Sequence, residues 1–177
     1  MVAAPQIPST LVTTYLHMTD PTDFHPSYSA DPDIKIISMN RVDVSFYRFL
    51  YSEVGRDCRW RDRLVMAEHE LREAISKPGV SIQVLYVQGV PAGYVELDQT
   101  DDSTEVAYFG LRSEFHGNGY GKHLLSYGVE CAWTDGAKHV WVHTCNLDGP
   151  HALNNYLKRG FKVYEVHEAP MPTRYAL

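Results

Sequence analysis

The spacing of apolar side chains predicts that strands and helices alternate along the chain. Residues 10–17 are rich in β-branched and aromatic side chains, which is typical of a strand, whereas the proline-containing residues 20–33 are expected to form an irregular loop. Residues 34–38 are predicted as a second, shorter strand. Apolar positions then recur at helical spacing over residues 46–54, and Asp43 is placed to cap the start of that helix.

The same reasoning extends to the rest of the chain. The remaining predicted elements are a helix containing Leu71, Ala74 and Ile75, strands at 81–87, 92–97 and 104–111, a helix over 121–132, a strand at 139–144, a helix over 151–159 and a strand at 161–167. Short turns join the three central strands, which predicts an antiparallel meander. The order β-β-α-α-β-β-β-α-β-α-β therefore predicts an α/β fold, with a mixed, largely antiparallel central sheet flanked by helices.

Length and composition narrow the class of protein. A chain of 177 residues is expected to form a single domain over residues 1–177, of which residues 1–9 are a leader. Its net charge of -6 disfavours binding to nucleic acid and favours amines over anions as substrates. Three widely spaced cysteines and the lack of a long apolar run predict a cytoplasmic protein that neither binds nor crosses a membrane.

The most informative stretch is the glycine-rich sequence His116-Gly117-Asn118-Gly119-Tyr120-Gly121, between a predicted strand and a predicted helix. Free N–H groups and a partial positive charge at a helix start bind anions, and glycines let phosphate oxygens approach the backbone. The preceding antiparallel meander disfavours a dinucleotide-binding βαβ unit. His123 follows Lys122 where a nucleotide-binding P-loop requires Ser or Thr. A phosphate or pyrophosphate of another ligand is therefore expected.

Two motifs resemble those of the GNAT superfamily of N-acetyltransferases. The signature turn Arg/Gln-x-x-Gly-x-Gly/Ala falls on His116, Gly119 and Gly121, with His116 in place of the usual Arg or Gln. The second motif, Ala-x-x-x-Tyr-x-x-x-Gly-Phe, matches Ala152, Tyr156, Gly160 and Phe161. The resemblance covers residues 81–168 well and implies a GNAT-like, acyl-CoA-binding fold with acetyl-CoA as the co-substrate and no metal.

The resemblance also implies a set of cofactor-binding residues. Asn146 stands six residues before Ala152 rather than the usual three. The implied cofactor-binding residues are Phe109, Gly110, Leu111, His116, Gly117, Asn118, Gly119, Tyr120, Gly121, Lys122 and Asn146.

Acyl transfer to an amine requires a base for the ammonium group and an acid for the leaving thiolate. The resemblance assigns the base to Glu105, with Glu96 on the neighbouring strand as the alternative, and the acid to Tyr156. Cys145 is disfavoured as a nucleophile because buried free cysteines are common. His139 and His143 lie in a strand and lack the facing geometry of a metal motif.

The acceptor is expected to bind near the first helices, where Tyr51, Trp60 and Arg61 combine aromatic faces with positive charge, together with Glu96. A carboxylate-bearing or aromatic amine would suit such a surface. The predicted function is acetyl transfer to a primary amine of a small molecule by direct attack in a ternary complex. A protein or peptide N-acetyltransferase and a non-catalytic acyl-CoA-binding module remain alternatives, and the sequence is compatible with a homodimer.

Overall fold

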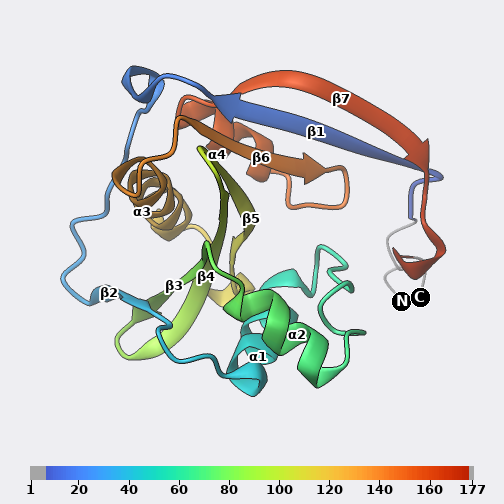
Figure 1. Cartoon of the computed structure of the whole chain (residues 1–177), viewed down its shortest axis with the longest axis horizontal. Coiled ribbons are helices and arrows are strands. Elements are labelled where there is room, and N and C mark those ends of the chain that lie inside the picture. The colour runs from blue at the N-terminus through green and yellow to red at the C-terminus, as the bar shows by residue number, and fades with distance from the viewer. Residues whose placement is uncertain (1–6, 176–177) are drawn as a thin grey trace.

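A computed structural model describes residues 7–175 of the chain, so most of the expected leader, residues 1–6, lies outside the described part. The elements follow the order expected from the sequence (Figure 1). The strands are β1 (Thr10–Met18), β2 (Ile34–Ser38), β3 (Val80–Val87), β4 (Val90–Thr100), β5 (Ser103–Leu111), β6 (His139–Cys145) and β7 (Lys162–Pro170). The helices are α1 (Val44–Gly55), α2 (Glu68–Ser76), α3 (Tyr120–Thr134) and α4 (Ala152–Lys158), with short 3-10 turns η1 (Pro21–Asp23), η2 (Ser113–Phe115) and η3 (Thr173–Tyr175).

The strands form one seven-stranded sheet in the order β2-β3-β4-β5-β6-β1-β7. Every neighbouring pair is antiparallel except β5 and β6, which run parallel. The parallel pairing covers only three positions and ends where Glu105 lies opposite Trp141. Beyond that position the two strands diverge, and Figure 1 shows β6 leaving β5 at a steep angle. The expected α/β class with a mixed, largely antiparallel sheet is confirmed.

Each face of the sheet has its own hydrophobic core. On one face α3 packs against β4, β5 and β6, and its residues Leu124, Leu125 and Val129 are fully buried against the sheet. On the other face α1 and α2 cover β3, β4 and β5, and Tyr47 and Leu50 of α1 are fully buried there. This apolar burial is the main stabilising contribution to the fold.

Local sequence explains where the first helices begin. The Asp43 side chain accepts a hydrogen bond from the Phe46 N–H (2.9 Å), as its predicted capping role requires. At the start of α2, Glu70 reaches back to accept from the Ala67 N–H (2.8 Å).

The loop that joins β1 to β2 is held against α3 by side chains of that helix. The Ser27 N–H donates to Ser126 Oγ (2.9 Å), and the Ser29 N–H donates to His123 Nδ1 (3.1 Å). The hydroxyl of Tyr120 donates to Asp31 (2.7 Å) at the start of the same helix. β1 itself lies between β6 and β7, so the first and last strands of the chain are neighbours at one end of the sheet.

Candidate active site

The divergence of β5 from β6 leaves polar backbone groups without a strand partner. β5 stays paired with β4 as far as Leu111, and β6 stays paired with β1 as far as Cys145. After Glu105, however, the edge of β5 that faces β6 has no ladder. Phe109, Gly110 and Leu111 lie on this open edge, where their backbone groups can pair with the amides of an extended ligand such as pantetheine.

The glycine-rich turn follows directly at the end of β5. Gly117 and Gly119 have φ angles of +83° and +77°, a region that favours glycine, and no atom lies within 4 Å of the position that a Cβ on Gly117 would occupy. The N–H groups of Tyr120, Gly121 and Lys122 belong to the first turn of α3, where no intrahelical acceptor exists. These donors, the helix dipole and the open space fit a pyrophosphate.

The side chains of the turn contribute less to the predicted anion site than its backbone N–H groups do. The His116 ring nitrogen Nε2 lies 3.1 Å from the Leu111 carbonyl oxygen, to which it donates, so this side chain ties the turn to the end of β5. Asn118 likewise donates from its amide to the His116 carbonyl oxygen (3.2 Å). Lys122 folds back towards Gly119 and adds positive charge beside the turn.

Tyr156 on α4 faces the open edge of β5. Its ring contacts Phe109 and Phe161 edge to face, with centroids 6.0 Å and 5.9 Å away. The side chain is buried, but among residues 7–175 no group forms a hydrogen bond with its hydroxyl. Burial raises the pKa of Tyr156, with a further contribution from the charge of Asp148. The phenol is therefore a neutral donor with no partner of its own.

Glu105 lies at the last paired position of β5 and meets a histidine of β6. The Nδ1 atom of His143 is 3.3 Å from Glu105 Oε1, and both side chains are partly exposed. The hydrogen bond to Glu105 raises the pKa of His143, while burial opposes this shift. Sequence reasoning considered His143 only as a partner of a Cys145 nucleophile or as a metal ligand, and disfavoured both. The β5–β6 register, which brings it beside Glu105, is not visible in the sequence.

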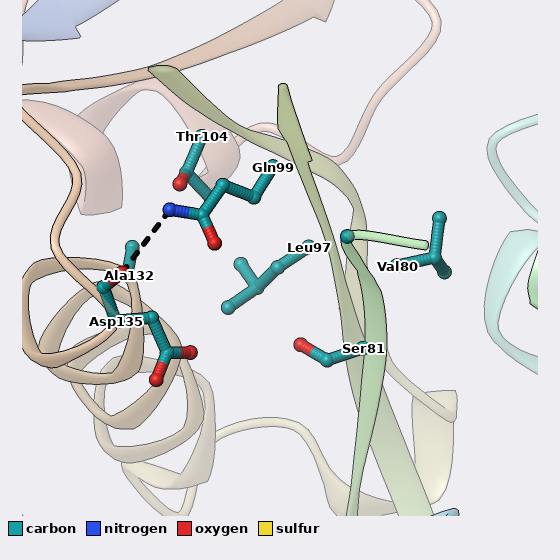
Figure 2. A pocket seen from close by; sticks show the side chains of 8 residues that line it. Val80, Ser81, Leu97, Gln99, Thr104, Ala132 and Asp135 are labelled. Carbon is teal, nitrogen blue, oxygen red and sulfur yellow. Dashed lines mark hydrogen bonds between the residues drawn. The ribbon is translucent and has the colours of Figure 1, made fainter. Parts of the chain in front are cut away.

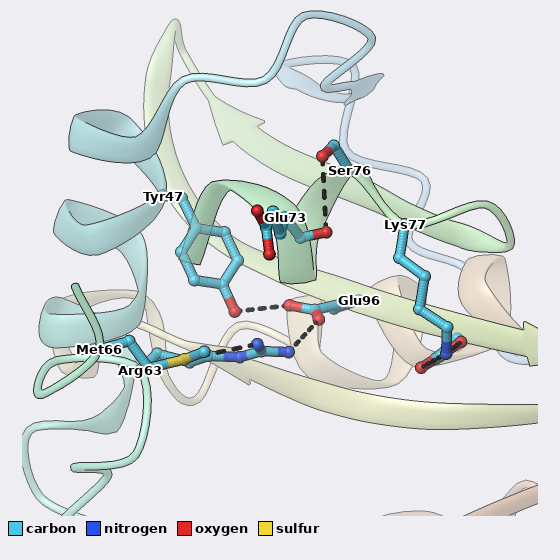
Figure 3. A network of polar contacts seen from close by, with 8 residues as sticks. Tyr47, Arg63, Met66, Glu73, Ser76, Lys77 and Glu96 are labelled. Carbon is cyan, nitrogen blue, oxygen red and sulfur yellow. Dashed lines mark hydrogen bonds and ion pairs between the residues drawn. The ribbon is translucent and has the colours of Figure 1, made fainter. Parts of the chain in front are cut away.

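Glu96 lies in a different environment, beneath α1 (Figure 3). It is completely buried, and its two oxygens accept from the Tyr47 hydroxyl (2.6 Å) and from Arg63 (3.0 Å). Burial raises the pKa of Glu96, and the charge of Arg63 opposes this shift. The Arg63 guanidinium also lies over the ring of Tyr108, 5.3 Å from its centroid. Glu96 therefore belongs to a closed polar network.

The other residues expected to bind the acceptor surround this network. Tyr51 is 1% exposed and packs against Trp60 and Tyr108, with ring centroids 5.3 Å and 5.2 Å away. Trp60 is half-buried, and Arg61 lies on the partly exposed loop between α1 and α2. The structure therefore groups Tyr51 and Trp60 with Glu96 inside an aromatic cluster and leaves Arg61 at its edge.

Asn146 holds strand β1 in place. Its side-chain oxygen accepts from the Val12 N–H (3.0 Å), and its side-chain nitrogen donates to the Thr10 carbonyl oxygen (2.9 Å). Asp148, which sequence reasoning missed, closes the loop after β6 by accepting from the Thr144 hydroxyl and the Cys145 N–H. The implied cofactor-binding residues thus lie around β5 and the α3 turn, except for Asn146, whose side chain is occupied by β1.

Asn155 is another residue that the sequence did not single out. Its side-chain nitrogen lies 3.9 Å from the position of a Cβ on Gly121, so it borders the start of α3. The cysteines offer no activated thiolate, because burial raises the pKa of Cys58 to about 11 and also raises that of Cys145.

Two cavities lie away from these residues. One, of about 180 Å³, lies between the strands and the C-terminal end of α3, which is the end away from the glycine turn (Figure 2). In its wall the Gln99 side chain donates to the Asp135 carbonyl oxygen (3.2 Å). The other, of about 300 Å³, lies beside β2 and the end of α2. Neither is lined by a residue of the predicted site.

Residues 7–175 contain neither a cluster of metal-ligating side chains nor a helix suited to a bilayer. Within this range no three His, Cys, Asp or Glu side chains are arranged to hold a metal ion. None of the helices in the described part combines the length and apolar character needed to cross a bilayer.

Comparison with known families supports what the geometry indicates. Residues 44–161, two thirds of the chain, match the sequence model of the acetyltransferase (GNAT) family. The chain therefore belongs to the GNAT family of acetyltransferases. Comparison with curated proteins found no match.

Solved structures share the fold at low sequence identity. A GCN5-related N-acetyltransferase from Kribbella flavida is 17% identical with a TM-score of 0.64, over 91% of this chain and 58% of that one. A second, from Sphaerobacter thermophilus, is 15% identical with a TM-score of 0.65, over 92% and 52%. The chain thus spans little more than half the length of these relatives. An aminoglycoside acetyltransferase from an uncultured soil sample, in complex with sisomicin, is 14% identical with a TM-score of 0.60, over 71% and 86%.

Proposed function

We propose that the protein transfers an acetyl group from acetyl-CoA to a primary amine of a small molecule, by direct attack within a ternary complex. The observation that carries this proposal is the end of the β5–β6 ladder at Glu105. The opening leads from a carboxylate, past the Tyr156 hydroxyl, to the anion-binding turn of α3.

The residues that hold acetyl-CoA follow from this arrangement. The backbone of Phe109, Gly110 and Leu111 pairs with the pantetheine amides, and the N–H groups from Gly117 to Lys122 bind the pyrophosphate. Bound in this way, acetyl-CoA supplies an activated thioester carbonyl at the open edge of β5.

The reaction forms one bond from nitrogen to carbon and breaks one bond from carbon to sulfur. A free amine is mostly protonated near neutral pH, so a base must remove a proton before or during attack. Glu105 accepts this proton, directly or through water, and His143 positions the Glu105 carboxylate. The Tyr156 hydroxyl donates to the departing thiolate and is reprotonated by the second proton that the nitrogen loses. The net products are the amide, coenzyme A as the thiol, and one proton, which Glu105 has accepted.

Glu105 is better placed than Glu96 for the role of base. Both oxygens of Glu96 already accept hydrogen bonds, and the side chain is completely buried. Glu105 is partly exposed, lies at the strand opening and has one neighbouring imidazole. A base must be within reach of the proton that it abstracts, which favours Glu105.

A small-molecule acceptor is supported by one of the structural relatives, because that relative is an aminoglycoside acetyltransferase. The test is to incubate the protein with labelled acetyl-CoA and a panel of amines, and to measure thiol release and labelled product. Tight binding of acetyl-CoA without thiol release across the panel would instead identify a non-catalytic acyl-CoA-binding module. If calorimetry detects no association with coenzyme A or acetyl-CoA, the proposal is wrong.

A further inference from the structure

The sheet face that carries Glu105 continues across β6, β1 and β7 as a row of aromatic rings. Tyr15 lies at its centre, with ring centroids 6.5 Å from Trp141, 5.7 Å from His143 and 6.2 Å from Tyr164. His17 stacks on Tyr164 at 4.5 Å. We call these five residues the aromatic platform.

The helices of this face leave the platform open. α1 and α2 pack on β3, β4 and β5, not on the three strands that carry the platform (Figure 1). The side chain of His143 is 45% exposed, and Tyr164 is 47% exposed. Exposed aromatic faces next to a proposed catalytic group are suited to bind part of the acceptor.

A second carboxylate borders the platform. Glu165 lies opposite Tyr15 in the β1–β7 ladder, so the two side chains are on the same face of the sheet. Burial raises the pKa of the Tyr164 hydroxyl, and the charges of Glu165 and Glu105 raise it further, so both carboxylates lie near this ring.

The lysine that lies on the same face of β7 as the platform has a carboxylate partner of its own. Lys162, which lies opposite His17, pairs with Asp23 at 2.6 Å. Arg63 pairs with Glu96, and Arg174 pairs with Asp62 at 2.9 Å. Within residues 7–175, neither Glu105 nor Glu165 pairs with a lysine or arginine. The platform therefore combines electron-rich rings with two carboxylates that no lysine or arginine of the described residues neutralises, an arrangement that attracts cations.

We infer that the acceptor is an aliphatic diamine or polyamine, whose reacting amine lies at Glu105 while a second ammonium group lies on Tyr15 and Tyr164 beside Glu165. This inference rests on the proposed acetyl transfer and defines its substrate class. It differs from the carboxylate-bearing or aromatic acceptor that Tyr51, Trp60 and Arg61 indicated, because Tyr51 is buried and packs against Trp60.

Strand spacing sets the expected length of the acceptor. Three inter-strand steps of about 4.8 Å separate β5 from β7, so the backbones at Glu105 and Glu165 are roughly 15 Å apart. The Glu105 side chain reaches from its strand towards His143 on β6. A chain of several methylene groups between the two nitrogens fits this span better than the shortest diamines do.

The test compares thiol release from acetyl-CoA with butylamine and with a series of α,ω-diamines of increasing length. We expect a longer diamine to exceed butylamine in kcat/KM by about tenfold, because a ring contact and a carboxylate both bind the second ammonium group. Glu165→Gln and Tyr164→Leu should remove most of this preference for the diamine over butylamine.

Glu168→Gln is the matched control. Glu168 lies opposite Val12 on the same strand, so its side chain is on the other face of the sheet. This variant makes the same change in net charge and should keep the diamine preference. Equal kcat/KM for butylamine and every diamine would overturn the inference, as would equal losses in Glu165→Gln and Glu168→Gln.

A direct binding measurement separates this inference from the proposed function. If acetyl-CoA binds but no amine is acetylated, the proposed function fails, and the substrate inference is then decided by calorimetry of the acetyl-CoA complex. Tighter binding of a diamine than of butylamine, lost in Glu165→Gln, would support the platform as a dication site. Equal binding of the two amines would overturn it.

Discussion

His143 Nδ1 lies 3.3 Å from Glu105 Oε1, so an imidazole of β6 and a carboxylate of β5 meet where the pairing between these strands ends. The contact joins the two edges of the opening at its narrow end. It also makes the charge of one residue depend on the protonation of the other.

The pKa of His143 should be above its ordinary value in the wild-type protein and should fall in Glu105→Gln, because the hydrogen bond and charge are lost while burial remains. NMR titration of the imidazole measures this change. Glu165→Gln, which removes a carboxylate that makes no contact with His143, should leave the titration nearly unchanged. An unshifted His143 in Glu105→Gln would contradict the contact.

The same pair predicts a pH dependence of stability. Because the folded-state pKa of His143 is raised, its contribution is fully present below the unfolded value of about 6.5 and is lost as pH rises through the folded pKa. The free energy of unfolding of wild type relative to Glu105→Gln should therefore be larger at mildly acidic than at alkaline pH. Denaturant unfolding at both pH values measures it, and a difference that grows with pH would contradict the assignment.

Tyr156→Phe should lower kcat by about 10- to 100-fold and change the affinity for acetyl-CoA little, because only the donor to the leaving thiolate is lost. Steady-state kinetics with a good amine acceptor measures both parameters. Tyr28→Phe removes a hydroxyl that donates to Glu130 on α3 and should keep the wild-type rate. Full activity of Tyr156→Phe would show that the thiolate takes its proton from elsewhere.

Gly117→Ala should weaken coenzyme A binding by about tenfold, because a methyl group would occupy the space in which phosphate oxygens approach the backbone. Gly89→Ala is the matched control, since Gly89 has a φ angle of +82° and also has open space around it. Both variants should lose about 1 kcal/mol of stability from the strained φ. Calorimetry with coenzyme A should separate them, and equal affinities would exclude the turn from the binding site.

The Arg63–Glu96 pair should show strong coupling in a double-mutant cycle. Glu96→Gln and Arg63→Met should each cost about 3 kcal/mol, because each leaves a buried polar partner unpaired. The double variant should lose much less than the sum of the two. Denaturant unfolding of the four proteins measures the coupling, and additive losses would show that the pair is not a unit.

Much of the architecture could be predicted from local sequence. The change from period-two to helical spacing placed each strand and helix, and Asp43 caps α1 as expected. The anion-binding turn was also visible, because its chemistry depends on consecutive backbone groups. The reason for the glycine of the second motif, by contrast, is visible only in the structure. Gly160 has a φ of +103°, and a Cβ there would lie 1.8 Å from the Asp23 carbonyl oxygen.

The sequence by itself determined the elements, the family motifs and the position of Tyr156, since these depend on residues close together in the chain. The tertiary structure decided that β1 lies between β6 and β7, that Asn146 holds β1, and that Glu96 is buried with Arg63. It also brought His143 to Glu105 and assembled the aromatic platform from three strands. Those relationships depend on strand order and register, and a contact between residues far apart in the chain leaves no local pattern to read.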